Sequence, residues 1–293
     1  MKRVVIITGA GGGLGRAYAL DLAARGLRVV VNNRRRQVDE SGLGTAERVA
    51  REIRDRGGEA IANEADARDE GSGEAMVRQA LDTWGRLDAL VANAGVDQHR
   101  AFHKITLDEV REIVEVNFFG TLYATHAAYA HMRAQGHGRI VVSTSSAGLH
   151  GLHGLSAYAA SKAALIGLMR SVAAEGAPKD VRCNAVAPFA ATKMTEKHGD
   201  ERFLTTMRPE YVAPLVALLV SERCQVNGQT ILAGGGRFRP AAMVEGPGLR
   251  YADPAEVTPL MLEADVDRLL SLGGAKEFAD ALSAFHDFCG PAE

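Results

Sequence analysis

Two residues with complementary chemistry, Tyr158 and Lys162, stand four positions apart in the segment 156–174. The Ala, Leu and Met content of this segment favours a helix, and a helix places residues i and i+4 on one face. A phenol ordinarily loses its proton near pH 10, and a neighbouring ammonium group favours the phenolate and lowers that pKa. The pair therefore predicts an acid/base centre in which Tyr158 exchanges a proton with a substrate oxygen.

Two more polar residues could serve the same site. Ser145 follows the apolar run 139–143, where its hydroxyl could hold a substrate oxygen. Asn117 falls among apolar neighbours in a predicted helix over 107–133, so we expect it to be buried and hydrogen-bonded. The Tyr-x-x-x-Lys spacing alone is common. A surface pair or simple packing is the alternative, and other motifs in the chain are needed to distinguish it from an acid/base centre.

A glycine-rich loop lies at the start of the chain. The apolar run 4–7 leads into Thr-Gly-Ala-Gly-Gly-Gly-Leu-Gly at 8–15, and a predicted helix follows over 16–25. Strand, glycine loop and helix form the first unit of a dinucleotide-binding fold, in which backbone N–H groups approach a pyrophosphate. A flexible glycine turn is the simpler alternative. We expect the cofactor contacts here to be Gly9, Gly11, Gly13, Leu14 and Gly15.

The second apolar run, 28–32, ends in Asn33 and Arg34. An acidic residue at this position would accept from the ribose hydroxyls of NAD, whereas arginine accommodates a 2′-phosphate. A guanidinium binds phosphate through charge-assisted hydrogen bonds. The sequence therefore favours NADP(H), with NAD still possible, and Arg35 and Arg36 are explained equally well as a solvated basic turn.

The remaining chain repeats the alternation of apolar runs and amphipathic segments up to Gly236. We predict an α/β fold, a Rossmann-like doubly wound parallel sheet of seven strands with helices on both faces. Ligands bind beyond the carboxyl ends of such strands. We expect the polar or turn residues that follow these strands to contact the cofactor: Asp66, at the adenine, and Asn93, Ala94, Gly95 and Pro188.

Residues 237–254 are rich in Pro, Gly and Arg, which is typical of a linker. The following segments 257–272 and 275–288 are predicted to be helical, but they are too small to form an independent core. We therefore expect domain 1–236 to bind the nucleotide. The extension 237–293 should pack on that domain or on a neighbouring subunit.

Composition limits the possible partners. The 293 residues carry a formal charge of −2, so no long-range field attracts nucleic acid or an anionic membrane. The three cysteines show no paired spacing, and no stretch is apolar for the length of a membrane crossing, so we expect a cytoplasmic protein. His150 and His153 lack a third ligand nearby, and we expect no metal site.

These motifs, in this order and spacing, resemble the short-chain dehydrogenases/reductases over residues 1–236. Within that family, the stretches 9–20, 54–63 and 208–216 are similar to the hydroxyacyl-CoA dehydrogenase domain of peroxisomal multifunctional enzyme type 2. The resemblance implies a catalytic tetrad and a homodimer or homotetramer. It also implies that Thr192 lies near the nicotinamide carboxamide. The implied tetrad is Asn117 anchoring a water, Ser145 holding the substrate oxygen, Tyr158 as acid/base, and Lys162 lowering the tyrosine pKa and binding the ribose.

The chain departs from the family pattern at three places. Asn33-Arg34 stands where the multifunctional enzyme has aspartate, Ala92 replaces an asparagine, and Phe189 replaces a glycine after Pro188. The leading hypothesis is hydride transfer between NADP(H) and a secondary alcohol or ketone, with a small-molecule substrate. An NAD-dependent 3-hydroxyacyl-CoA dehydrogenase is the alternative, and a non-catalytic nucleotide sensor is the alternative from another class.

Overall fold

The computed structural model describes residues 2–35, 42–192, 194–195 and 200–289. Their core is one sheet in the order β3-β2-β1-β4-β5-β6-β7-β8, and the pairings from β3 across to β7 are all parallel. The strands are β1 Val4–Ile7, β2 Arg28–Asn32, β3 Glu59–Asn63, β4 Ala89–Ala92, β5 Gly138–Ser143, β6 Val181–Pro188, β7 Thr230–Gly234 and β8 Arg237–Ala241.

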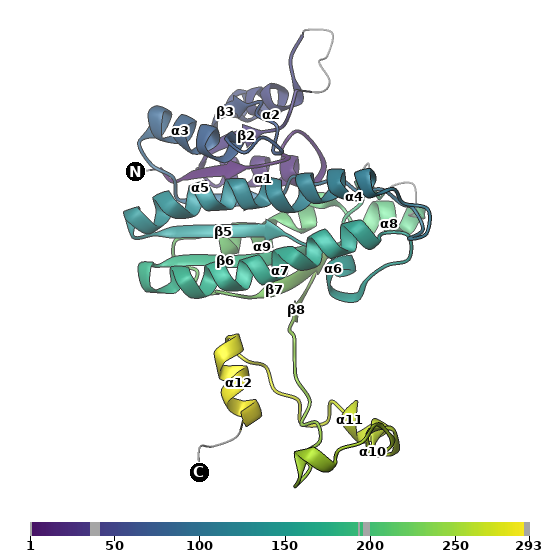
Figure 1. The fold of residues 1–293 in the computed structure, drawn as a ribbon. Coiled ribbons are helices and arrows are strands. Elements are labelled where there is room, and N and C mark those ends of the chain that lie inside the picture. Colours follow the sequence, from purple (N-terminus) through teal and green to yellow (C-terminus); the bar gives the residue numbers. More distant parts are fainter. Residues whose placement is uncertain (1, 36–41, 193, 196–199, 290–293) are drawn as a thin grey trace. The chain divides into compact units, whose positions relative to one another are not determined.

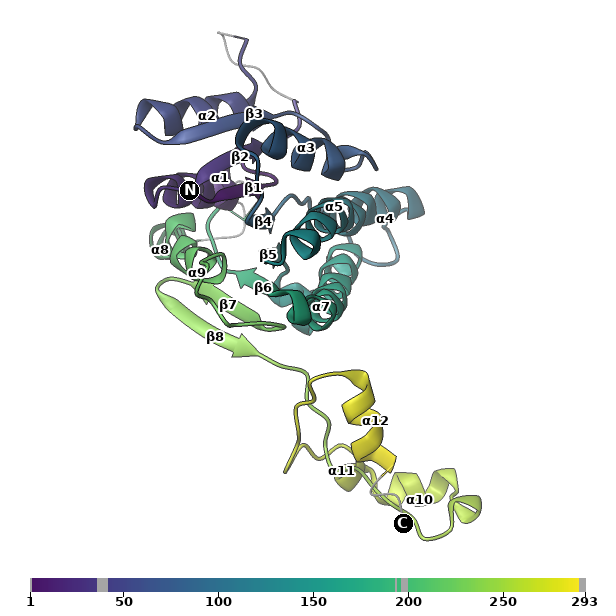
Figure 2. The same cartoon turned by 90° about the vertical axis from the view of Figure 1, so that its left-hand side faces the viewer.

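Helices cover both faces of the sheet, as Figure 2 shows in its end-on view. The residues of β1, β4 and β5 are buried throughout, because a strand covered on both faces has no side that meets water. One apolar core lies between the sheet and the helices Gly13–Ala24, Thr45–Asp55 and Ala213–Leu219, and a second lies between the sheet and the helices Ser72–Trp84, Gly120–Gln135 and Ser156–Gly176. The predicted fold class is therefore confirmed.

The main helices follow the predicted alternation (Figure 1). The longest is α7, which carries the Tyr158–Lys162 pair, and shorter 3-10 turns connect several elements. The helices of the sheet-containing unit are α1 Gly13–Ala24, α2 Thr45–Asp55, α3 Ser72–Trp84, α4 Leu107–Val114, α5 Gly120–Gln135, α6 Ser146–His150, α7 Ser156–Gly176, α8 Glu201–Thr206 and α9 Ala213–Leu219.

The strand order reverses direction at β1. From β1 the chain builds β2 and β3 on one side and then crosses to β4 and the later strands on the other. At such a switch point the connections after neighbouring strands diverge and leave a crevice at the carboxyl ends. The loops after β1 and β4, which hold the glycine motif and the segment 93–96, meet at this crevice.

Two predicted elements differ in the structure. Residues 237–241, predicted as the start of a linker, form an eighth strand that adjoins β7 at the edge of the sheet. The predicted helix 107–133 is divided by the π-helical turn Glu115–Phe119, which separates α4 from α5.

The chain divides into two compact units, Met1–Pro240 and Ala241–Glu293. The second contains α10 Pro259–Ala264, α11 Val266–Leu269 and α12 Ala281–Cys289, which are shorter than the predicted helices. No side chain from 241 to 289 is buried. No helix in the described part of the chain has both the length and the apolar character that a membrane crossing needs.

Candidate active site

Helix α7 carries Tyr158 and Lys162 on one face, as the spacing predicted. The Nζ atom of Lys162 lies 5.8 Å from the centre of the Tyr158 ring. The lysine is only 4% exposed, and its Nζ donates to the Ser143 carbonyl over 2.7 Å at the end of β5. This hydrogen bond fixes the direction of a long side chain, so the ammonium is held beside the tyrosine.

Ser145 begins helix α6 and its hydroxyl accepts from the Ala147 N–H over 3.1 Å. The same hydroxyl acts on the phenol of Tyr158 and lowers its pKa. Gly148 allows this arrangement, because a Cβ there would lie 2.8 Å from the backbone carbon of Lys162. The short helix can therefore approach α7 closely enough to bring the two hydroxyl groups together, as the sequence predicted.

Asn117 lies in the π-helical turn and is completely buried. Its Oδ1 accepts from the Val96 N–H over 2.8 Å, and its Nδ2 donates to the Val96 carbonyl over 2.9 Å. The second amide hydrogen goes to the Ser161 hydroxyl over 3.0 Å. The amide side chain therefore locks the loop after β4 in place. π-turns inside α-helices are frequent at functional sites.

Two residues of the tetrad, Asn117 and Lys162, meet at Gly95. A Cβ at this position would lie 3.2 Å from Asn117 Oδ1 and 3.3 Å from Lys162 Nζ. Gly95 thus brings backbone close to both groups, and a larger residue would displace one of them. The four residues of the predicted tetrad accordingly form one cluster at the carboxyl ends of β4 and β5.

The pKa of Tyr158 differs in direction from the prediction. Burial raises it above the ordinary value, the hydrogen bond with Ser145 lowers it, and the charge of Asp97 raises it. The spacing of the pair indicates the attraction of Lys162 but not burial, and burial also lowers the pKa of Lys162 to about 8. Because its own pKa is raised, Tyr158 is a protonated phenol at neutral pH.

The glycine loop has the backbone geometry of a phosphate cradle. Gly9 and Gly13 have φ of 65° and 52°, in the left-handed region that favours glycine. A Cβ on Gly15 would lie 2.3 Å from the Gly9 carbonyl oxygen, so this glycine lets α1 approach the loop. Leu14 packs against the core and anchors the start of the helix.

The N-terminus of α1 is suited to an anion. No side chain caps the helix at Gly12, its first turn has no acidic residue, and a Cβ at Gly12 would meet nothing within 4 Å. The first N–H groups of a helix and its dipole attract phosphate. The residues present therefore fit the pyrophosphate of a nicotinamide dinucleotide, whose nicotinamide would supply or accept the hydride.

A polar network holds the loop after β4 against the glycine loop. The Thr8 hydroxyl accepts from the N–H groups of Asn93 and Ala94, both over 3.0 Å. The Asn93 amide donates to the Thr8 carbonyl over 3.2 Å and accepts from the Ser143 hydroxyl over 3.3 Å. Asn93, Ala94 and Gly95 therefore lie at the crevice as predicted.

Arg34 and Asp66 come from the ends of neighbouring strands, β2 and β3, and lie 3.7 Å apart. The Asp66 carboxylate also accepts from Arg68, with its closest contact at 2.7 Å. These hydrogen bonds lower the pKa of Asp66 to about 2. Arg34 thus lies just beyond the end of β2 with a carboxylate beside it.

Asn33 lies directly under the glycine loop. Its Nδ2 donates to the Thr45 hydroxyl over 2.6 Å, and a Cβ on Gly11 would lie within 2.7 Å of both side chains. Gly11 is therefore required for close contact between the loop and the end of β2. The sequence placed Asn33 and Gly11 at one site but did not identify Thr45.

Two of the predicted nicotinamide contacts can be located. Pro188 is the last residue of β6, and the methyl group of Thr192 lies 3.4 Å from the position of a Cβ on Gly13. Thr192 thus faces the glycine loop. Arg36 lies outside the described residues.

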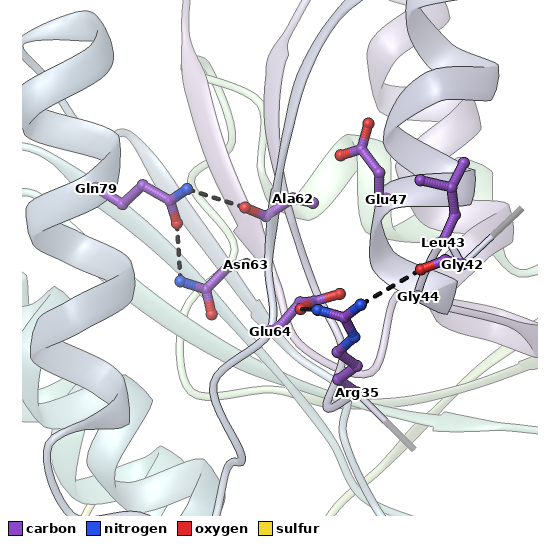
Figure 3. Close-up of a pocket in the computed structure, with 9 residues that line it drawn as sticks. All are labelled: Arg35, Gly42, Leu43, Gly44, Glu47, Ala62, Asn63, Glu64 and Gln79. Atoms are coloured by element: carbon purple, nitrogen blue, oxygen red, sulfur yellow. Dashed lines mark hydrogen bonds and ion pairs between the residues drawn. The ribbon is translucent and has the colours of Figure 1, made fainter. Parts of the chain in front are cut away.

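A separate hollow of about 450 Å³ lies on the outer side of β3 (Figure 3). In it Arg35 lies 3.4 Å from Glu64, and Gln79 donates to the carbonyl of Ala62 over 2.9 Å. None of the tetrad residues lines this hollow. Arg35 therefore points to the sheet edge, whereas Arg34 pairs with Asp66.

Sequence analysis did not identify several residues that build the site. Thr8 and Ser143 lie at strand ends, where their polar groups hold Asn93 and Lys162. In the sequence, a polar residue at the end of an apolar run could have indicated both. Val96 acts through its backbone, for which no side-chain signal exists.

We expect Lys162→Met to stabilise the protein while disabling the site. Because burial lowers the pKa of Lys162, keeping the lysine charged at pH 7 destabilises the fold by at most about 3 kcal/mol. The hydrogen bond to Ser143 offsets about 1 kcal/mol of this cost. This cost fades as the pH rises from about 8 to 10.5, so the gain in Tm at pH 7, about 2–4 °C, should shrink at pH 10. The exposed Lys104→Met is the control in thermal scans, and a lower Tm for Lys162→Met at pH 7 would contradict the assignment.

The sequence profile of the short chain dehydrogenase family matches residues 3–202. A putative short-chain type dehydrogenase/reductase of Mycobacterium tuberculosis is 39% identical over 276 residues, which cover 94% of this chain and 96% of that protein. The peroxisomal multifunctional enzyme type 2 of Mus musculus is 42% identical over 236 residues, which cover 80% of this chain and 32% of the enzyme.

Solved structures agree with these relatives. A short chain dehydrogenase from Mycobacterium avium superposes with a TM-score of 0.81 at 36% identity, covering 94% of this chain and 95% of that one. The full-length multifunctional enzyme type 2 of Drosophila melanogaster gives 0.83 at 32% identity, covering 98% of this chain and 48% of that one. The chain therefore belongs to the short-chain dehydrogenase/reductase family, and it is an oxidoreductase of the class that uses a nicotinamide cofactor.

Proposed function

We propose that this protein transfers a hydride between NADP(H) and a secondary alcohol or ketone, with Asn117, Ser145, Tyr158 and Lys162 as the catalytic residues. The observation that carries the proposal is the position of the buried Lys162 ammonium, which is fixed by the Ser143 carbonyl and lies 5.8 Å from the centre of the Tyr158 ring, with Ser145 acting on the same phenol. Hydroxyl, phenol and ammonium groups so arranged can hold a carbonyl oxygen and protonate it.

The proposed mechanism assigns one task to each side chain. The hydroxyl of Ser145 donates to the substrate carbonyl and orients it. The phenol of Tyr158 gives its proton to that oxygen as negative charge develops there. A nicotinamide held at this site would supply the hydride to the carbonyl carbon. Lys162 binds the ribose and can help replace the proton of Tyr158, and the Asn117 turn supports a water in that relay. Such proton transfer contributes roughly 10²–10⁴-fold to a rate.

The protonation state favours reduction at neutral pH. Reduction needs the phenol, and a raised pKa keeps Tyr158 protonated through the neutral range. Oxidation of an alcohol needs the phenolate, so its rate should rise with pH. NADP(H) preference, proposed from Arg34, is consistent with a reductase.

The decisive test is NADPH and NADH oxidation at 340 nm with neutral ketones, diketones and 3-oxoacyl thioesters. We expect turnover with at least one ketone, faster with NADPH, with a reduction rate that stays level from pH 6 to 8. The absence of turnover with every carbonyl would favour a nucleotide sensor, which needs the glycine loop but has no use for the tetrad.

The 3-oxoacyl thioesters in that panel test the second candidate, an NAD-dependent 3-hydroxyacyl-CoA dehydrogenase. Two relatives fit a role on acyl substrates. One is the multifunctional enzyme type 2, and the other is a 3-oxoacyl-[acyl-carrier-protein] reductase of Synechocystis, which is 36% identical over 243 residues and has such a substrate in its name. Preference for NADH together with a thioester would establish this candidate over the first.

We further propose that the extension 237–293 packs on the nucleotide domain or on a neighbouring subunit, in a cytoplasmic homodimer or homotetramer. Supporting this, the unit 241–293 has no buried side chain among its described residues, and Leu260, Leu270 and Phe288 are each more than 70% exposed. Water disfavours such a surface on a free unit.

The oligomer is tested by size-exclusion chromatography with light scattering. We expect two or four times the chain mass of 31.1 kDa, and a smaller species for a variant in which Leu270 and Phe288 are serine. A 31.1 kDa wild-type particle whose extension is cut readily by protease would contradict both proposals.

A further inference from the structure

Ser161 stands between Tyr158 and Lys162 on α7 and is only 2% exposed. A serine one residue before the lysine is most simply a small residue that lets a helix pack. Its hydroxyl, however, makes two specific hydrogen bonds, and both partners belong to the proposed catalytic tetrad.

The first hydrogen bond comes from the π-helical turn. Asn117 has two amide hydrogens, of which one goes to the Val96 carbonyl and the other to the Ser161 hydroxyl over 3.0 Å. The second hydrogen bond runs within α7, where the Ser161 hydroxyl donates to the Tyr158 carbonyl over 2.8 Å. The oxygen therefore accepts from one tetrad residue and donates to the other.

This arrangement joins three parts of the structure at one atom. The loop after β4 is clamped by Asn117, Asn117 is tied to Ser161, and Ser161 is tied to the first turn of α7, which carries Tyr158. We propose that Ser161 is a positioning residue that sets the distance and angle of the Tyr158 phenol relative to the Asn117 turn. The inference rests on the proposed function, because it assigns Ser161 a role in that reaction.

Removing this hydroxyl has a defined physical consequence. In Ser161→Ala the second amide hydrogen of Asn117 loses its acceptor in a buried place, so the side chain must rotate or stay unpaired. Either change loosens the link to α7. A displacement of about 1 Å in a reacting group can cost on the order of 100-fold in rate.

The test compares Ser161→Ala with Ser72→Ala, a buried serine of α3 that is 3% exposed and whose hydroxyl has no hydrogen-bond partner among the described residues. We expect a 10–100-fold lower kcat for Ser161→Ala with the KM values for NADPH and ketone within about twofold, and an unchanged kcat for Ser72→Ala. If Ser161→Ala does not fold, Ser161→Cys replaces it, and its kcat should fall with the same unchanged KM values.

A double variant separates positioning from simple destabilisation. If Ser161 acts through Asn117, adding Ser161→Ala to Asn117→Ala should lower kcat by less than about threefold, whereas independent effects would multiply. A wild-type kcat for Ser161→Ala, or multiplying effects, would overturn the inference. Failure of the wild-type protein to reduce any ketone would instead count against the proposed function.

Discussion

Tyr158→Phe should reduce ketone turnover by about 10³-fold or more while NADPH still binds. In the proposed mechanism the phenol transfers its proton to the substrate oxygen, whereas Ser145 only holds that oxygen. General acid catalysis contributes roughly 10²–10⁴-fold. The measurements are steady-state kcat for the ketone and the fluorescence titration of NADPH.

Tyr18→Phe is the matched control for this prediction. Tyr18 is 1% exposed in α1, and its hydroxyl has no hydrogen-bond partner among the described residues. We expect full activity from it. A Tyr158→Phe variant within a few-fold of the wild-type kcat would remove Tyr158 from the mechanism.

Arg34→Asp should lower kcat/KM for NADPH by about 100-fold and change that for NADH by only a few-fold. The guanidinium at the end of β2 is the group proposed to bind the 2′-phosphate, and charge-assisted hydrogen bonds of this kind contribute roughly 1.5–3 kcal/mol. The variant also places a carboxylate next to Asp66, which now lies 3.7 Å from the arginine. Two carboxylates there repel a phosphate.

Arg35→Asp tests whether the position, and not the total charge, matters. Arg35 is the next residue but pairs with Glu64 in the hollow on the outer side of β3 (Figure 3). We expect less than a threefold effect on either cofactor. Equal losses for NADPH and NADH in Arg34→Asp would contradict the phosphate assignment and favour NAD.

Much of the fold could be predicted from the sequence because strands, turns and helices are each indicated by short stretches of neighbouring residues. Continuous apolar runs such as 4–7 and 28–32 predicted buried parallel strands, and they pair as β1 and β2. The glycine spacing predicted the loop before α1, where Gly9 and Gly13 do have positive φ. Ser145 lies at the site because it follows β5 at the carboxyl edge of the sheet, and Tyr158 and Lys162 lie there because one face of α7 carries both.

Other features depend on interactions that a linear pattern does not contain. At the π-turn around Asn117, the backbone hydrogen bonds change from the i→i+4 to the i→i+5 pattern. The sequence there has the composition of an ordinary α-helix and does not indicate this change. The strand at 237–241 forms because β7 offers an open edge, although Pro and Arg are typical of a linker. The pKa of Tyr158 depends on burial, which the Tyr158–Lys162 spacing cannot show.

The most direct test of hydride transfer follows the hydrogen itself. Wild-type protein is incubated with a ketone substrate and NADPH that carries deuterium at both C4 positions, and the alcohol is analysed by mass spectrometry. We predict that the alcohol carries one deuterium on the carbinol carbon. In a second reaction, with unlabelled NADPH in heavy water, we predict no deuterium on that carbon once exchangeable hydrogens have been washed out. Alcohol that takes its carbon-bound hydrogen from solvent, or no alcohol with any ketone, would contradict the assignment of this protein as a nicotinamide-dependent oxidoreductase of ketones.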